Sequence, residues 1–540
     1  MDKSNPLPFL SVMIILLLLP HVSNSQAAPS RDSIFVTFLQ CLKSHTTQPD
    51  QVSNIVYAQT NASYTSIFEA FVRNARFNTP STTKPLLIVT PLHENQVQAT
   101  IVCSKTIGLH LKIRSGGHDF EGISYISEVP FVILDMFNFQ NITVDIQNEI
   151  AVIQTGASLG QVYYRIWEKS KVHGFPAGVC STVGVGGHLS GGGYGNMMRK
   201  FGLSIDNVVD AKIVDVNGRV LDKNSMGEDL FWAIRGGGGA SFGVILSYTV
   251  KLVSVPEKVA VFQVDKTLDQ NATDLVFQWQ QVAPHTDDRL FMRLVLQPVS
   301  SKTLKGQKTI RASFQALFLG GADELVTLLE KEFPLLGLKK ETCKEMSWIE
   351  SVFWWANFND GSSLNALLER NHYKVHSSKR KSDYVQSPIP KDGLKWILKK
   401  MVELGKVELV FNPYGGKMNE VAFDATPFPH RAGYLYKIQY TVSWEEKGDD
   451  VEKSLLSQIR MLYSYMTPFV SKNPRSAYVN YRDLDIGINR HGKDDYNDGV
   501  VYSIKYFNKN FERLVNVKTK VDPENFFWNE QSIPTLPNKA

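Results

Sequence analysis

Two glycine-rich stretches decide the fold: Phe175-Pro-Ala-Gly-Val-Cys-Ser-Thr-Val-Gly-Val-Gly-Gly-His-Leu-Ser-Gly-Gly-Gly-Tyr-Gly195 and, earlier in the chain, Arg114-Ser-Gly-Gly-His-Asp-Phe-Glu-Gly122. Glycine has no Cβ, so its backbone N–H groups can approach a pyrophosphate closely and form concave anion-binding sites. A bulkier loop would keep the phosphates away from the backbone. The two stretches therefore predict a binding site for a dinucleotide.

The spacing of these glycines does not fit a Rossmann fold. Gly191 to Gly195 is dense in glycine, but no G-x-G-x-x-G motif opens a helix with an acidic residue about twenty positions further on. NAD binding by that fold is therefore disfavoured. A third cluster, Arg235-Gly-Gly-Gly-Gly239, follows the helix-like Asp229-Leu-Phe-Trp-Ala233 and is typical of a tight helix-to-strand turn. For this cluster, backbone geometry and ligand contact both remain open.

The pattern of secondary structure changes near residue 255. A chain of 540 residues exceeds the size of one hydrophobic core, and 43% hydrophobic against 21% charged residues is the balance of a folded protein. Before the change, short β-rich runs alternate with helix-like stretches; after Pro256, amphipathic helices and strands follow with few glycines. The expected strands are Leu86–Thr90, Leu111–Ile113, Phe131–Asp135, Val208–Val214 and Leu435–Tyr440, and the expected helices are Glu94–Thr106, Ser158–Glu168, Ala272–Gln281 and Ala322–Phe333.

Residues 1–25 are typical of an export signal. Lys3 gives a weak positive start, Leu7 to Leu19 is an apolar run, and cleavage after Ser25, or after Ala28, follows small residues. A single-pass membrane anchor is the alternative, but the run is short and polar residues follow it at once. We therefore expect a secreted protein of the extracellular space or cell wall, with a vacuole or an endomembrane lumen as further options. N-glycosylation is expected at Asn61, Asn141 and Asn271.

Charge and cysteine content narrow the class of protein further. The formal net charge is +5 without a concentrated basic arm, so nucleic-acid binding is not expected. The four cysteines are Cys41, Cys103, Cys180 and Cys343. In an oxidising compartment we favour a disulfide between Cys41 and Cys103, because both lie in the N-terminal part outside the glycine-rich segment, although other pairings remain open. Cys180 lies in a loop, which is more typical of a reactive thiol than of a core thiol.

Five further segments carry a resemblance to a known family. They are Ser225-Met-Gly-Glu-Asp-Leu-Phe-Trp-Ala-Ile-Arg-Gly-Gly-Gly-Gly239, Asn412-Pro-Tyr-Gly-Gly416, Pro427-Phe-Pro-His-Arg-Ala-Gly433, Asn480-Tyr-Arg-Asp483 and Asn529-Glu-Gln-Ser-Ile-Pro534. With the two glycine-rich stretches, they resemble the berberine bridge enzyme-like family over nearly the whole mature chain. This family is of the vanillyl-alcohol-oxidase type. The resemblance implies an α+β fold with a two-part FAD-binding domain of the vanillyl-alcohol-oxidase (PCMH) type and a substrate domain whose antiparallel sheet is backed by helices.

The resemblance also sets the expected domain bounds and the cofactor. Residues 26–255 are expected to form the first part of the FAD domain, 256–475 the substrate domain, and 476–540 a C-terminal segment that completes the FAD domain. FAD is expected to be bound covalently twice, by His118 at the flavin 8α-methyl carbon and by Cys180 at ring carbon C6. An imidazole nitrogen and a thiolate are the nucleophiles that such bonds need, whereas a turn histidine and a free thiol are the alternative. The other expected FAD-binding residues are Arg114, Ser115, Gly116, Gly117, Ser181, Thr182, Val183, Gly184, Gly187, His188, Gly192 and Gly193.

Four residues are candidates for the chemistry of alcohol or amine oxidation. A phenol acts as a base only when its pKa falls well below about 10, and a nearby cation is the usual cause. Tyr194 is the first candidate base and Lys437 the candidate cation, with Gln439 on the same face of its strand by period-two alternation. By resemblance to cannabinoid synthases, Tyr481 is the second candidate base. A packed core phenol is the alternative for Tyr481, and a solvated strand residue is the alternative for Lys437.

Two positions bear on the substrate and the electron acceptor. Many carbohydrate- and monolignol-oxidising members of the family carry tyrosine where this chain has Phe120, so a prenylated or aromatic substrate is favoured over a sugar. Val183 occupies a position that resembles the oxygen-access position of the family, and its small side chain predicts an oxidase that releases H2O2.

The predicted function is therefore a secreted FAD oxidase of a plant specialised metabolite, with or without oxidative cyclisation. The substrate is expected to be a phenolic, a prenylated aromatic, an allylic alcohol or an alkaloid. A flavin-scaffolded cyclase or Diels-Alderase without net redox and an oligosaccharide oxidase of wall defence are the alternative enzymes, and a non-enzymatic storage or allergenic protein is a third class. We expect a monomer whose partners are a small-molecule substrate and O2, without a metal or a membrane span.

Overall fold

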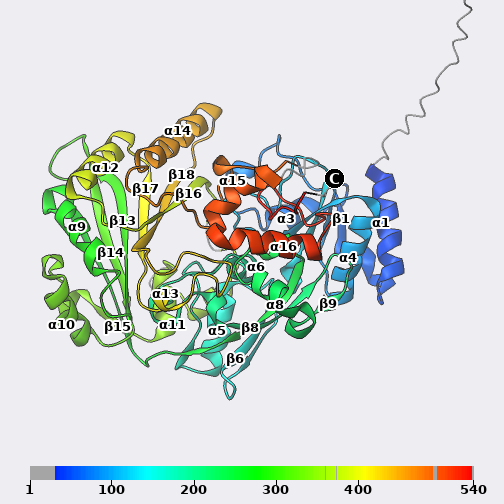
Figure 1. The fold of residues 1–540 in the computed structure, drawn as a ribbon, viewed down its shortest axis with the longest axis horizontal. Coiled ribbons are helices and arrows are strands. Elements are labelled where there is room, and N and C mark those ends of the chain that lie inside the picture. The colour runs from blue at the N-terminus through cyan, green and yellow to red at the C-terminus, as the bar shows by residue number, and fades with distance from the viewer. Residues whose placement is uncertain (1–30, 359–360, 372–373, 491–495, 538–540) are drawn as a thin grey trace, which may run out of the picture.

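Two lobes make up the molecule, and the chain passes from the first to the second and back. The computed structural model describes residues 31–358, 361–371, 374–490 and 496–537. One lobe contains the N-terminal half and the C-terminal helices, and the other contains the segment between them (Figure 1). The predicted export signal at 1–25 lies outside the described residues.

The first lobe contains two main sheets and a two-stranded one made of β7 (His173–Gly174) and β11 (Val253–Ser254). In the smaller main sheet, three parallel strands and one antiparallel edge strand follow the order β1 (Val56–Ala58), β2 (Leu87–Val89), β4 (Phe131–Asp135), β3 (His110–Arg114). The larger sheet is antiparallel, in the order β5 (Ile142–Asp145), β6 (Ile150–Gln154), β10 (Val244–Lys251), β8 (Val208–Val214), β9 (Val220–Leu221). The helices that bear on the site are α5 (Leu159–Lys169), α6 (Val185–Ser190) and α8 (Lys223–Ala233).

A disulfide links two neighbouring helices of this lobe. Helix α1 (Arg31–His45) packs against α4 (Glu94–Ile107), and Cys41 of the first is bonded to Cys103 of the second. The sequence-based pairing is thereby confirmed. Cys180 and Cys343 are free thiols.

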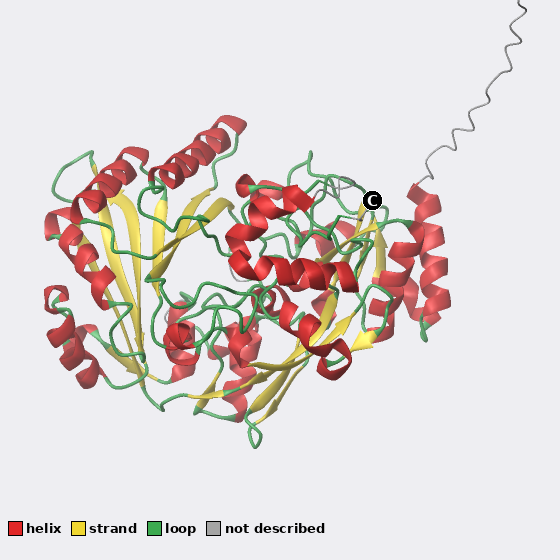
Figure 2. Cartoon of the chain, viewed as in Figure 1, coloured by secondary structure: helices red, strands yellow, loops and turns green. Residues whose placement is uncertain are grey.

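The second lobe is one antiparallel sheet of seven strands backed by helices. Its strands follow the order β15 (Lys344–Met346), β12 (Val259–Thr267), β14 (Lys308–Phe318), β13 (Leu290–Ser300), β17 (Glu408–Pro413), β18 (Tyr436–Trp444), β16 (Ser377–Val385). The helices α9 (Ala272–Val282), α10 (Ala322–Glu332), α12 (Lys391–Leu404) and α14 (Asp449–Tyr465) cover its outer face (Figure 2). The expected α+β fold with an antiparallel sheet backed by helices is confirmed.

Strand β18 shows why the sheet has one apolar and one functional face. Tyr436, Ile438 and Tyr440 pack into the hydrophobic core under the helices. Because successive side chains of a strand point to opposite faces, Lys437 and Gln439 point away from that core. The face of the sheet toward the first lobe therefore carries polar groups.

The C-terminal segment returns to the first lobe. Helices α15 (Tyr496–Phe507) and α16 (Phe511–Val521) lie over that lobe (Figure 1), and α16 packs against α8. The buried ammonium of Lys518 donates to the carbonyl oxygen of Ser241 at 2.8 Å and pairs with Asp522 at 2.6 Å. Segments far apart in sequence thus close the same lobe.

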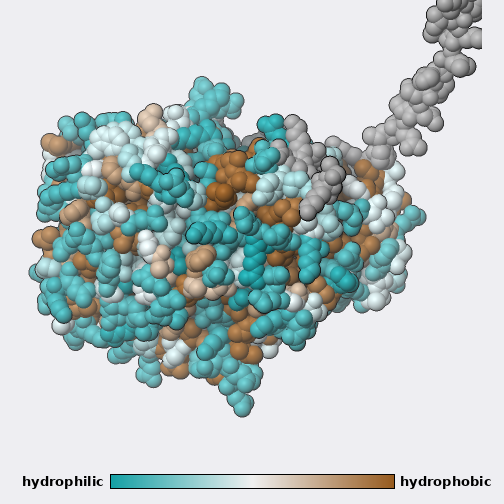
Figure 3. Space-filling view, in the orientation of Figure 1, coloured by the Kyte–Doolittle hydropathy of each residue, from teal (hydrophilic) through white to brown (hydrophobic). Residues whose placement is uncertain are grey.

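Three surface features bear on the expected secretion. Hydrophilic residues predominate on the face shown in Figure 3. Asn61, Asn141 and Asn271 are all exposed, so glycosylation at these positions remains a prediction that the geometry allows. Among the described residues, no helix combines the length and apolarity needed to cross a bilayer.

Candidate active site

A cavity of about 500 Å³ lies where the two lobes meet, within the range typical of small-molecule sites. The first lobe supplies its glycine-rich loops, the sheet of the second lobe supplies Arg293 and Gln439, and the C-terminal segment supplies Tyr481 and Arg482. Three parts of the sequence therefore have to come together before the cavity exists.

The two glycine-rich loops contact each other through their backbones. A Cβ at Gly116 would overlap the backbone nitrogen of Gly184, and a Cβ at Gly184 would overlap the hydroxyl of Ser115. A side chain at either position would push the loops apart. Of the residues expected to bind FAD, these loops place Ser115, Gly116, Gly117, Gly184 and Gly187 along the cavity wall.

The third glycine cluster also reaches the cavity. Gly238 and Gly239 line it, whereas the Arg235 guanidinium lies over the ring of Phe231, 4.5 Å from its centroid. Of the two interpretations left open by the sequence, this geometry favours ligand contact by the backbone. Side-chain-free backbone from three loops is the surface that a dinucleotide phosphate requires.

His118 and Cys180 come from different loops but contact the same hydroxyl. The Thr182 Oγ1 atom lies 3.0 Å from Nε2 of His118 and 3.6 Å from Sγ of Cys180, and both residues line the cavity. Burial lowers the pKa of His118 to about 3, so the imidazole is neutral and keeps a lone pair. The two nucleophiles predicted from the sequence are therefore brought together.

Arg73 is a neighbour of this pair that sequence reasoning missed. Burial raises the pKa of the Cys180 thiol, while the hydroxyl of Thr182 and the positive charge of Arg73 oppose that effect. Arg73 also helps to lower the pKa of His118. The Arg73 guanidinium donates to the carbonyl oxygen of Arg370 at 2.6 Å, and this hydrogen bond links Arg73 to the loop before β16.

Some predicted cofactor residues do not reach the cavity with their side chains. The Arg114 guanidinium is fully buried, where it pairs with Asp135 at 2.6 Å and donates to the carbonyl oxygens of Ile67 and Phe68. Arg114 therefore holds the first glycine-rich loop in place by contacts on the side away from the cavity. Four other predicted residues, Ser181, Thr182, Gly192 and Gly193, also shape the loops without lining the cavity wall.

His188 lines the cavity as a neutral histidine. Its Nε2 accepts a hydrogen bond from the Gly178 backbone N–H at 3.1 Å. Burial, with a smaller effect of the nearby Lys437, lowers the pKa of His188 to about 3. Because Nε2 is the acceptor, the proton of this imidazole lies on Nδ1.

Lys437 lies inside a cage of three tyrosine rings. Its Nζ atom is 3.1 Å from the ring centroid of Tyr194, 3.9 Å from that of Tyr478 and 4.6 Å from that of Tyr481. The side chain is fully buried, and within the described part of the chain Nζ has no hydrogen-bond partner. Cation–π contact with the rings is thus its main favourable interaction. Tyr478 was not predicted from the sequence.

The polar groups of the cage differ in how readily they ionise. Burial, with a smaller contribution from the Arg293 cation, lowers the pKa of Lys437 well below its usual value. Burial and the neighbouring Tyr194 raise the pKa of Tyr481 well above its usual value. The hydroxyls of Tyr194 and Tyr481 are hydrogen-bonded to each other, and either of them can be the donor.

The remaining wall of the cavity combines polar and apolar groups. Gln439 lines it on the face of β18 that also carries Lys437, which confirms the predicted alternation. Arg293 donates through Nε to the side-chain oxygen of Asn412 at 2.9 Å. Phe120, whose ring centroid is 5.5 Å from that of Tyr481, and Val183 provide apolar surface. Sequence periodicity could have found Arg293, because its neighbours Met292 and Leu294 belong to the core.

Comparison with known proteins adds family matches to this geometry. Residues 85–223 match a family model described as FAD binding domain, and residues 477–534 match one described as berberine and berberine like. The protein named berberine bridge enzyme-like 21 from Arabidopsis thaliana is 59% identical over 531 residues, with 98% of each chain covered.

Solved structures superpose over almost the whole chain. The structure of BBE-like 28 from Arabidopsis thaliana gives a TM-score of 0.86 at 44% identity and covers 93% of this chain and 100% of that one. Wild-type Phl p 4.0202, described as a glucose dehydrogenase, gives 0.87 at 40% identity with 93% and 100% covered. A Phl p 4 variant with valine in place of an isoleucine, described as a glucose oxidase, gives 0.87 at 41% identity with the same coverage.

Proposed function

The chain belongs to the berberine bridge enzyme-like family of FAD-linked oxidoreductases, and we propose that it is a secreted oxidase of a small plant metabolite. The observation that carries this proposal is the convergence of two groups on one cavity. His118 and Cys180 both line the cavity, and both contact the Thr182 hydroxyl. The cage of Tyr194, Tyr481 and Lys437 adjoins the same cavity.

In this proposal the first lobe holds FAD. His118 and Cys180 would hold the flavin covalently, His118 at the 8α-methyl carbon and Cys180 at ring carbon C6, and the glycine backbones of the three loops would offer N–H groups to the phosphates. The fit is supported by the loop contact at Gly116 and Gly184, which leaves the wall free of side chains. When bound, the flavin would supply the acceptor for a hydride from the substrate, and O2 would be the final electron acceptor.

The residues of the cage handle the proton of the substrate hydroxyl. Tyr194 accepts this proton at its phenolic oxygen, while Tyr481 donates a hydrogen bond to the same oxygen. Because burial lowers the pKa of Lys437, its amine becomes charged most readily when Tyr194 is a phenolate. The positive charge would then lie against the ring face of Tyr194 and stabilise the negative charge that the phenolate spreads over its ring. Because the pKa of Tyr481 is raised, Tyr194 is the base in this proposal and Tyr481 is its partner. The Gln439 amide offers a hydrogen bond to the substrate oxygen.

Phe120 and Val183 support the finer parts of the proposal. Phe120 gives the cavity an aromatic wall beside Tyr481, which suits a phenolic, prenylated or allylic alcohol substrate. Val183 lines the cavity, and a Phl p 4 variant that gained a valine is described as an oxidase where the wild type is a dehydrogenase. This pattern supports O2 as acceptor and H2O2 as product. The exposed sequons at Asn61, Asn141 and Asn271 support secretion.

A sugar oxidase is the second candidate function. It is favoured by the glucose-oxidising activities ascribed to Phl p 4 and by the polar groups of Arg293 and Gln439 on the sheet side of the cavity. Hydroxyl-rich substrates need several hydrogen-bond partners in a buried site.

Anaerobic reduction of the flavin, read by absorbance against a panel of metabolites, tests the proposal. The panel contains cinnamyl-type alcohols, prenylated phenols, benzylisoquinolines and glucose oligomers. Bleaching by an aromatic or allylic alcohol, followed by H2O2 release in air, supports the leading function, and bleaching by oligosaccharides alone supports the second. Conversion of a substrate without any bleaching would contradict both and indicate a cyclisation without net redox.

A further inference from the structure

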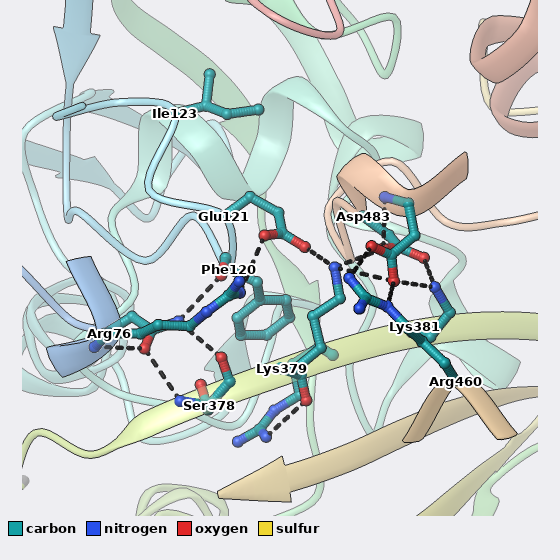
Figure 4. A network of polar contacts seen from close by, with 12 residues as sticks. Arg76, Phe120, Glu121, Ile123, Ser378, Lys379, Lys381, Arg460 and Asp483 are labelled. Carbon is teal, nitrogen blue, oxygen red and sulfur yellow. Dashed lines mark hydrogen bonds and ion pairs between the residues drawn. The ribbon is translucent and has the colours of Figure 1, made fainter. Parts of the chain in front are cut away.

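A cluster of charges, buried at its centre, joins both lobes (Figure 4). Strand β16 of the second lobe contributes two lysines whose side chains are only 2% exposed. None of these charges belongs to the cavity wall. The residues of this cluster, the Lys379 cluster, are Arg76, Glu121, Lys379, Lys381, Glu452, Arg460, Asp483 and Asp485.

Lys379 is the one lysine of the cluster that contacts carboxylates of two different segments of the first lobe. Its ammonium pairs with Glu121 and, at 2.7 Å, with Asp483. Figure 4 shows its side chain reaching between these two carboxylates, next to the ring of Phe120. Burial alone would lower the pKa of Lys379, but the carboxylates of Asp483 and Glu121 outweigh that effect and raise it. The lysine therefore stays charged.

Lys381 shares the partners Asp483 and Asp485 with Lys379, and its Nζ atom also lies 4.5 Å from the ring centroid of Tyr463. It is equally buried, and it pairs with Asp483 at 2.5 Å and with Asp485 at 2.9 Å. Its ion pairs do not include Glu121. Among their ion pairs, the contact with Glu121 is therefore what distinguishes the two lysines.

The two carboxylates that Lys379 joins flank the rings of the active site. Glu121 follows Phe120 directly, and Asp483 lies two residues after Tyr481. The rings of Phe120 and Tyr481 face each other with centroids 5.5 Å apart. A second ion pair, between Asp119 and Arg482 at 3.2 Å, joins the same two segments on the other side.

Stability alone is a poor explanation for such a cluster. Removing charges from water costs several kcal/mol per ion, and buried ion pairs are often no more stable than apolar residues of the same volume. What they do impose is a geometry, because each charge must keep its partner. A lysine from the substrate lobe thus dictates how the turn after His118 sits against the segment after Tyr481.

We propose that Lys379 is a positioning residue, which holds the Phe120 turn against the Tyr481 segment through Glu121 and Asp483 and so sets the width of the substrate site. The relevance for catalysis rests on the proposed function. The geometry itself is independent of it, so the test uses a readout that needs no turnover.

The test places 4-fluorophenylalanine at position 120 of the full-length, FAD-loaded protein and records its fluorine NMR signal. Glu121→Gln is the variant most compatible with folding. It leaves two buried positive charges, Lys379 and Lys381, beside two negative charges, Asp483 and Asp485. Lys379→Met is the stronger variant, and Lys381→Met is its control with the same loss of charge and burial.

We expect Glu121→Gln and Lys379→Met to displace or broaden the fluorine signal by more than its native linewidth, and Lys381→Met to leave it in place. In the FAD-loaded enzyme, Glu121→Gln should also lower the limiting rate of anaerobic flavin reduction by the best panel substrate by about tenfold to 100-fold. A loss of this size is expected when a reacting group is displaced by about 1 Å. If Lys379→Met does not fold, Glu121→Gln decides. An unchanged signal in Glu121→Gln, or equal displacement in both lysine variants, overturns the proposal. If no panel compound reduces the flavin, the NMR result still stands and only the proposed function fails.

Discussion

Replacing Lys437 by methionine should remove activity without reducing stability. The Lys437 amine is buried without a hydrogen-bond partner among the described residues, and such a polar group costs about 1–3 kcal/mol when neutral and more when charged. Its contacts with the rings of Tyr194 and Tyr478, at 3.1 and 3.9 Å, return about 0.5–2 kcal/mol. Methionine has similar length and no charge, so Lys437→Met is expected to leave the thermal midpoint unchanged or to raise it slightly.

The loss of activity should be much larger. If the ammonium supports Tyr194 as base, its removal takes away most of a general-base contribution of about 10²–10⁴. The assay is the limiting rate of flavin reduction in anaerobic stopped flow, with the thermal midpoint measured on the same samples. Lys518→Met is the control, and it should lower the thermal midpoint instead. Lys518 is also fully buried, but it is paired with Asp522, and breaking such a pair costs about 3–5 kcal/mol of stability.

The pH dependence of stability gives an independent check. Because the pKa of Lys437 is lowered in the folded protein, the unfolded chain binds more protons between that pKa and the usual lysine value. Stability should therefore rise with pH through this window, and Lys437→Met should lose that rise. A Lys437→Met enzyme that reduces its flavin within an order of magnitude of the native rate would refute the role assigned to this lysine.

Three further predictions concern the cofactor loops and the buried histidines. Cys180→Ser and His118→Ala should each keep flavin on acid-denatured protein, because one bond remains, whereas the double variant should release it; release from either single variant contradicts two attachments. Val183→Ile should slow the reoxidation of the flavin by O2 by about tenfold or more, because the larger side chain fills space beside the cavity, while the rate of flavin reduction stays unchanged. Equal reoxidation rates in the variant and the native enzyme would count against the role assigned to Val183. Burial lowers the pKa of His430 to about 3, so the unfolded chain takes up its proton first as pH falls below 6.5, and this residue contributes about 1.4 kcal/mol per pH unit to the decline in stability. The pKa values of His118 and His188 are lowered to about 3 as well, so His430→Phe should make the decline shallower by this contribution, and an unchanged slope would show that His430 does not contribute.

Local features of the fold were predictable because their signals are local. The strands Phe131–Asp135 and Val208–Val214 were predicted with the bounds that β4 and β8 have. The helix predicted over Glu94–Thr106 extends one residue further in α4. Hydrophobic periodicity and turn residues carry this information within a dozen positions.

Contacts between distant segments were not predictable in the same way. Arg114 was expected near the cofactor, but β3 and β4 pair in a register that sets Arg114 opposite Asp135, and the ion pair follows from that register. Tyr478 and Arg73 reach the site only through packing of the C-terminal segment and the N-terminal loop. Periodicity shows which side of an element is polar, but it does not show which other element that side will meet.

The distribution of roles between the lobes follows from this difference. The groups proposed to bond FAD come from two loops of one lobe, and their motifs can be read from the sequence because both loops must keep glycine where their backbones touch, at Gly116 and Gly184. The groups proposed to handle the substrate come from one face of a sheet whose other face is core. A change at Gln439 or Arg293 leaves that core intact, so the substrate side can vary at little cost in stability while the cofactor side cannot. The substrate is therefore the property of this enzyme that a family resemblance constrains least, and the cavity wall of β13 and β18 is where it is decided.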